Sequence, residues 1–190
     1  MKLSEHKVLK KEILALPLKE KDKLLLRLIA KDKVLTEHLH FLLLEDESNL
    51  LERVEAIKEN ILSTMQLLAI SKGTTAKEVL LNMRKLAKLV NHNFKVTKAV
   101  FEDVELRFFL LNHTITEFKS TKYSSTKNYE HIFANYFIKF ALMTLRKFEK
   151  LHEDLQFDLR EEVNKILNKI HKGKMAQLGA ELDLPQQIDL

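Results

Sequence analysis

The stretch "NLLERVEAIKENILSTMQLLAIS", residues 49–71, decides the fold class. Its apolar residues recur at intervals of three and four, which is the spacing of one face of an α-helix. The residues on this face are Leu50, Val54, Ile57, Ile61, Met65 and Leu68. Because neither proline nor glycine interrupts the pattern, we predict one long amphipathic helix over this stretch.

The composition extends this prediction to the whole chain. Only 3 glycines and 2 prolines occur in 190 residues, so few of the turns that separate short strands can form. Hydrophobic residues make up 45% and charged residues 31%, as in globular proteins. The absence of cysteine excludes disulfides, cysteine-based zinc sites and thiol catalysis. We therefore expect an all-α globular protein.

The periodicity and the breaks between periodic segments predict eight helices. Their expected ranges are about 4–16, 18–31, 33–45, 49–71, 75–90, 98–119, 127–153 and 158–172. Short connections predict antiparallel neighbours, in either an irregular bundle or a HEAT-like helical array. We expect one domain over residues 1–172, a polar loop at 119–128, and a weakly apolar tail at 173–190 that is docked or flexible.

Three pairs of residues have the spacing of helix N-terminal caps. They are Ser48 or Asn49 with Glu52, Thr75 with Glu78, and Asp158 with Glu161. The helix expected at 98–119 is apolar on most of its circumference, so we predict that it is buried between other helices. A faint similarity between residues 35–45 and 151–161 raises the alternative of helical repeats.

His38 and His40 have the His-x-His spacing that metal sites use. On a helix, positions two apart lie about 200° from each other, so we expect His38 to face the core and His40 to face water. Other histidine–glutamate and glutamate–glutamate pairs occur about as often as chance predicts for this composition. We therefore expect no metal, no cofactor and no catalytic residue, and a metal-dependent all-α enzyme is a remote alternative.

Charge is distributed unevenly along the chain. Residues 41–71 carry 2 basic and 6 acidic residues, whereas residues 72–100 carry 7 basic residues and 1 acidic residue. On a helical wheel, Lys77, Arg84 and Lys88 lie within about 40° of one another, with Lys85 to one side. These four residues form a candidate binding surface for an anionic partner.

Residues 65–84, "MQLLAISKGTTAKEVLLNMR", resemble the helix-turn-helix of phage-repressor-like proteins. Ala69, Gly73 and Val79 match the spacing of the small residue, the turn glycine and the core residue of that motif. The resemblance implies that residues 65–91 bind DNA, with the second helix in the major groove and its basic residues near phosphates. Lys72 and Asn82 depart from the motif, which has apolar residues at both positions.

A non-catalytic helical scaffold or interaction protein is the function that these observations favour. We expect a protein partner bound through a helix-lined surface, and DNA binding through residues 65–91 is the alternative. The N-terminus has no apolar segment typical of a signal peptide, and no apolar run is long enough for a membrane span. We therefore expect a cytoplasmic protein. The sequence leaves the partner's identity and the oligomeric state open.

Overall fold

The computed structural model describes residues 5–118 and 128–188. Within these residues the chain forms nine α-helices and no strand, which confirms the all-α prediction. The helices fall into two compact units, Met1–Asp46 and Glu47–Leu190, whereas the sequence predicted one domain over 1–172. The polar loop predicted at 119–128 lies outside the described residues except for Asn128.

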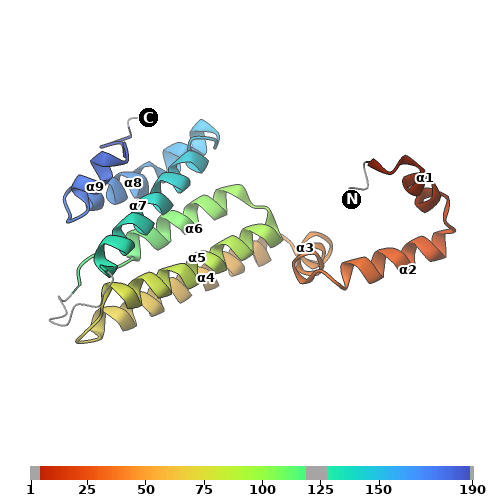
Figure 1. Cartoon of the computed structure of the whole chain (residues 1–190), viewed down its shortest axis with the longest axis horizontal. Helices are drawn as coiled ribbons and strands as arrows, with labels where there is room; N and C mark the ends of the chain where they lie inside the picture. Colours follow the sequence, from red (N-terminus) through yellow and green to blue (C-terminus); the bar gives the residue numbers. More distant parts are fainter. Residues whose placement is uncertain (1–4, 119–127, 189–190) are drawn as a thin grey trace. The chain divides into compact units, whose positions relative to one another are not determined.

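The first unit contains the helices α1 (Lys7–Ala15), α2 (Leu18–Ile29) and α3 (Lys33–Leu44) (Figure 1). No described residue of this unit is buried. His40 is exposed and its Nδ1 lies 2.8 Å from Glu45 Oε1, while His38 is partly buried. The two histidines therefore differ in exposure as helical geometry predicts, but His38 reaches no buried core.

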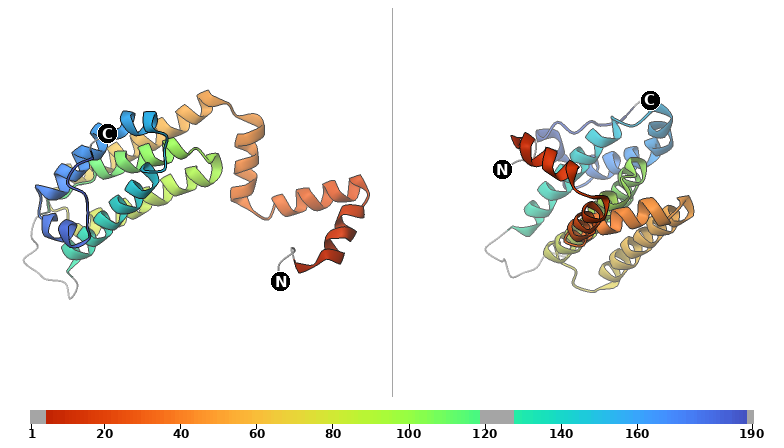
Figure 2. Two further views of the ribbon diagram at one scale, coloured as in Figure 1. Left: turned by 90° about the horizontal axis from the view of Figure 1, so that it is seen from above. Right: turned by 90° about the vertical axis from the view of Figure 1, so that its right-hand side faces the viewer.

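The second unit is a bundle of six helices, of which α6 is the central one (Figure 2). Its members are α4 (Glu47–Ile70), α5 (Ala76–Thr97), α6 (Val100–His113), α7 (Tyr129–Phe148), α8 (Glu153–His171) and α9 (Ala176–Glu181). Helix α6 contacts α4, α5, α7 and α8, which confirms the prediction that it is buried between other helices. The helices pack against one another, which supports the predicted helical bundle. The helices in closest contact are one or two places apart along the chain, as they also are in a stacked array of helix pairs.

Phenylalanine side chains from α6 and α7 fill the centre of the bundle. Phe108 and Phe148 meet edge to face with ring centroids 5.7 Å apart, and Phe133 and Phe137 are 5.6 Å apart. All four are at most 1% exposed. Burial of each such side chain stabilises the fold by about 1.5–3 kcal/mol, so the aromatic residues of these helices serve as core.

Helix α5 is longer than the sequence predicted, because tertiary contacts outweigh local propensity. The prediction ended it at residue 90, where asparagine and histidine residues follow, but the helix continues to Thr97. Val96 is fully buried, and Asn91 accepts a hydrogen bond from Arg107 of α6. Lys98 then ends the helix in a left-handed conformation with φ of 59°.

Helix α6 is shorter than predicted and ends at His113 instead of residue 119. Lys169 of α8 reaches its C-terminus, where Nζ donates to the carbonyl oxygens of Leu111, Asn112 and Thr114 at 3.3, 2.8 and 2.6 Å. The last carbonyls of a helix have no partner within the helix and attract a cation. Burial lowers the pKa of Lys169 to about 8.

Two of the three predicted caps are wrong. Helix α4 begins at Glu47, so Ser48 and Asn49 lie inside its first turn. Helix α8 begins at Glu153, five residues before Asp158, and its N-cap is His152, whose Nδ1 accepts from the backbone of Asp154. Helix α4 thus begins two residues earlier than predicted, and helix α8 five residues earlier.

The tail from residue 173 docks onto the bundle as far as Ile188. Met175 and Leu184 are each 5% exposed. A Cβ at Gly179 would lie 3.1 Å from Cγ2 of Ile170, so a glycine lets α9 approach α8 closely. The amide of Asn164 both donates to and accepts from the backbone of Ile188. In the described part of the chain, no helix is long and apolar enough to cross a membrane.

Candidate functional site

The α4–α5 hairpin carries the predicted basic surface and is closed by the predicted cap. The Glu78 backbone N–H donates to Thr75 Oγ1 at 3.3 Å, and the Thr75 backbone N–H donates to Glu78 Oε2 at 2.9 Å. This reciprocal pair is a capping box, which confirms the cap predicted at Thr75 and Glu78. Donation by the Thr75 backbone and hydroxyl lowers the pKa of Glu78.

The hairpin does not have the features that the helix-turn-helix resemblance requires. Helices α4 and α5 run side by side over most of their length in both Figure 1 and Figure 2. Ala69, which the motif places at the close approach between helices, is exposed, and so is Lys72. Val79 is fully buried, as in the motif. The geometry is that of a helical hairpin.

All four residues of the predicted binding surface are exposed on α5. They are Lys77, Arg84, Lys85 and Lys88, which we call the α5 basic stripe. Two of them lie over tyrosine rings of α7: Lys77 Nζ is 5.5 Å from the centroid of Tyr129, and Arg84 Cζ is 5.1 Å from that of Tyr136. Such contacts restrict the cations without neutralising them.

Helix α7 continues the stripe along its boundary with α5. Lys147 Nζ lies 4.5 Å from the ring centroid of Phe94 on α5. Residues 77, 84 and 94 of α5 contact residues 129, 136 and 147 of α7, respectively. Because the residue numbers increase together, the two helices run parallel. Lys139 and Arg146 of α7 are also exposed. We call the boundary between the two helices, with the α5 basic stripe and Lys147, the α5–α7 seam, and its basic side chains make it positively charged.

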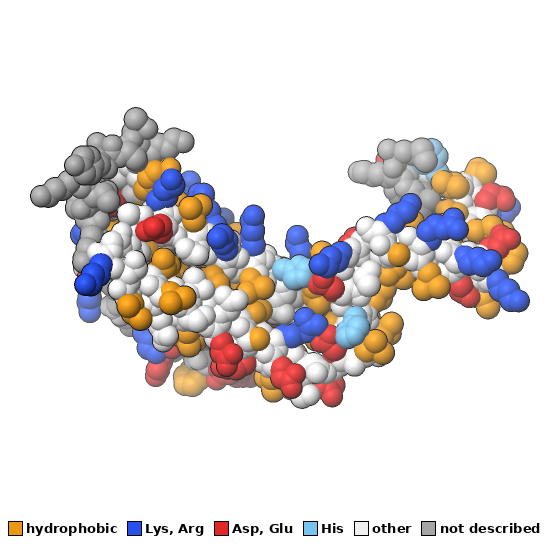
Figure 3. Space-filling view, turned by 90° about the horizontal axis from the view of Figure 1, so that it is seen from below, with side chains coloured by type: hydrophobic (Ala, Val, Ile, Leu, Met, Phe, Trp, Pro, Cys, Tyr) orange, Lys and Arg blue, Asp and Glu red, His pale blue; other side chains and the backbone are white. Residues whose placement is uncertain are grey.

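Exposed glutamates gather on the neighbouring helix α4 instead. They are Glu47, Glu52, Glu55 and Glu59. Figure 3 shows acidic side chains along one edge of this unit and Lys and Arg side chains along the opposite edge. The two edges therefore favour partners of opposite charge.

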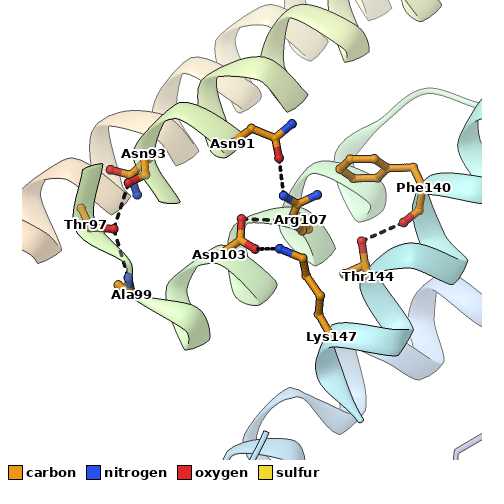
Figure 4. Close-up of polar contacts among 9 residues, drawn as sticks. All are labelled: Asn91, Asn93, Thr97, Ala99, Asp103, Arg107, Phe140, Thr144 and Lys147. Carbon is orange, nitrogen blue, oxygen red and sulfur yellow. Dashed lines mark hydrogen bonds and ion pairs between the residues drawn. The ribbon is translucent and has the colours of Figure 1, made fainter. Parts of the chain in front are cut away.

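Beneath the α5–α7 seam lies a cluster of charged side chains that the sequence analysis did not find (Figure 4). Asp103 of α6 accepts from Arg107 Nε at 2.9 Å and from Lys147 Nζ at 2.5 Å. Arg107 also donates from Nη2 to Asn91 Oδ1. Asp103 is 1% exposed and Arg107 2% exposed. A signal was present: an acidic and a basic residue four apart on a helix predicted to be buried must find partners.

Arg107 and Arg84 lie over neighbouring rings of α7. The Arg107 guanidinium carbon is 5.4 Å from the centroid of Phe140, and the Phe140 and Tyr136 rings are stacked with centroids 6.1 Å apart. Burial raises the pKa of the Tyr136 hydroxyl, and the charges of Arg84 and Arg107 oppose that shift. Both guanidinium groups are thus close enough to Tyr136 to act on it electrostatically.

A pocket of about 320 Å³ lies elsewhere in the same unit, between the start of α7 and α9. Glu130, His131 and Glu181 are among its lining residues. Nε2 of His131 lies 2.9 Å from the side-chain amide of Asn135. No three His, Asp or Glu side chains among the described residues lie close enough together to hold a metal ion.

No protein-family model, curated protein sequence or solved structure matches this chain.

Proposed function

We propose that this chain is a non-catalytic helical interaction protein that binds an acidic segment of another protein along the α5–α7 seam. The observation that carries the proposal is the placement of Lys77 and Arg84 over Tyr129 and Tyr136, next to the exposed Lys85 and Lys88. Long basic side chains lose conformational entropy when they bind a partner. Cations that already lie on aromatic rings lose less of it, so such a surface is suited to binding.

The acidic edge of α4 favours an extended peptide over duplex DNA as the partner. A peptide segment can follow one seam, whereas a duplex presents phosphates over a much wider surface. The glutamates at positions 52, 55 and 59 lie on the helix next to α5 and are exposed. They repel a broad polyanion, while an acidic peptide confined to the α5–α7 seam avoids them.

The test is direct binding of the full chain to labelled probes, measured by fluorescence anisotropy. The probes are a poly-glutamate peptide, a neutral peptide of equal length, and a duplex DNA of random sequence. We expect saturable binding of poly-glutamate that weakens as salt concentration rises, and no binding of the neutral peptide.

Two outcomes contradict the proposal. If poly-glutamate fails to bind at low salt, the seam is a solvated surface without a partner of this class. If duplex DNA binds more tightly than poly-glutamate at the same salt concentration, the DNA-binding alternative explains the basic stripe better.

A further inference from the structure

The cluster beneath the α5–α7 seam contains more positive than negative charge. Arg107 and Lys147 contribute two cations, and both bond to the single carboxylate of Asp103. A buried cation without an anionic partner is costly. Arg107 is buried and Lys147 is partly exposed, so the cluster carries one positive charge in excess that an anion from solvent could balance.

One hydrogen-bond donor of the cluster is unsatisfied. Arg107 Nη1 is buried and has no hydrogen-bond partner among the residues that the structure describes. In Figure 4 the corresponding nitrogen of the guanidinium lies on the side of Phe140. An aromatic ring replaces only part of a hydrogen bond to a charged donor. The donor is therefore incompletely satisfied, and because it is buried, an oxyanion reaches it only if a covering side chain moves.

Asn91 connects this buried donor to the exposed basic stripe. Its side chain accepts from Arg107 Nη2, and the residue is exposed on α5. Positions 84 and 91 lie within roughly 20° of each other about the helix axis, since they are seven residues apart. The guanidinium groups of Arg84 and Arg107 also lie over the stacked rings of Tyr136 and Phe140. A ligand on the stripe thus lies directly above the cluster.

We propose that the α5–α6–α7 junction is a receptor for one carboxylate, which accepts a hydrogen bond from Arg107 Nη1 and balances the charge of the cluster. The exposed side chain of Asn91 moves aside to admit it. The planar guanidinium presents paired donors that match the two oxygens of a carboxylate. That this carboxylate belongs to a Glu or Asp side chain of a partner rests on the proposed function, whereas the receptor itself does not.

The receptor is tested with acetate alone, without any partner. The full chain labelled with ¹⁵N-arginine is titrated with sodium acetate and, separately, with sodium chloride at equal ionic strength. We expect a saturable shift of the Arg107 Nε–Hε resonance with acetate and a smaller, linear shift with chloride. The resonance is assigned by its loss in Arg107→Lys, and Arg27 of the first unit is the internal control. Equal, non-saturating shifts with both salts would show that no carboxylate binds and overturn the proposal.

A pair of isosteric variants tests the same receptor without removing Arg107. Asn91→Asp places a carboxylate of the chain itself on the guanidinium, while Asn82→Asp makes the same change roughly 180° away on α5. We expect Asn91→Asp to weaken poly-glutamate binding about fivefold or more, and Asn82→Asp less than about twofold. Equal losses in the two variants would contradict the receptor, because only general surface charge would then matter.

The two proposals fail separately. Poly-glutamate binding to the native chain without a saturable acetate shift at Arg107 supports the interaction surface and overturns the receptor. A saturable acetate shift without poly-glutamate binding supports the receptor and overturns the proposed function.

Discussion

Asp103 is the residue on which the buried charges of α6 depend. It accepts from both Arg107 and Lys147, so Asp103→Asn leaves two cations without their anion. We expect a loss of about 3–5 kcal/mol in the free energy of unfolding, measured with urea. Glu105→Gln is the matched control, since its pair with Lys58 is partly exposed and contributes about 1 kcal/mol or less. Similar losses in the two variants would contradict a buried, mutually dependent cluster.

Lys169 gives the stability of the bundle a defined pH dependence. Burial lowers its pKa to about 8, so between about pH 8 and pH 10 the folded chain binds fewer protons at this site than the unfolded chain. By linkage, the contribution of Lys169 to stability rises with pH across this range. We expect the free energy of unfolding of the native chain to rise by about 1–3 kcal/mol relative to that of Lys169→Met between about pH 8 and pH 10. A difference that stays constant with pH would contradict the lowered pKa.

Capping is the feature at the scale of single helices that can be tested most simply. Thr75 and Glu78 exchange hydrogen bonds at the start of α5, and we expect Thr75→Ala to lower the free energy of unfolding by about 1 kcal/mol. Thr64 lies inside α4, where its hydroxyl bonds only to the exposed Asn60 side chain. Thr64→Ala should therefore change stability by less than about 0.5 kcal/mol. Unfolding in urea measures both, and equal effects would show that the capping box contributes nothing specific.

The helices themselves could be predicted from the sequence, but several of their ends could not. Local signals identified the face of α4 with Val54, Ile57 and Ile61 and the cap at Thr75, because both depend on residues close in sequence. The end of α6 depends on Lys169, which is more than fifty residues away and carries no local signal. The exposed basic stripe followed from helical spacing. The cluster beneath it required knowing that α5, α6 and α7 meet.

At the scale of the whole molecule, the two units differ in how much core they have. Every residue found buried in the described part of the chain lies in the second unit. Helices of 9 to 12 residues are marginal in water without tertiary contacts. We therefore expect residues 47–190 alone to unfold cooperatively, within a few degrees of the full chain by circular dichroism. Residues 1–46 alone should show little helix. Loss of cooperative unfolding in 47–190 would show that its fold depends on the first unit.

The most direct measurement of the central claim is the affinity of poly-glutamate for two double variants with equal net charge. Lys85→Glu/Lys88→Glu reverses two exposed lysines of the α5 basic stripe, and Lys172→Glu/Lys174→Glu reverses two exposed lysines after α8. The proposed function predicts that the first variant binds poly-glutamate about tenfold or more weakly than the native chain, and the second within about twofold of it. Equal losses in both variants, or no loss in the first, would contradict binding at the α5–α7 seam.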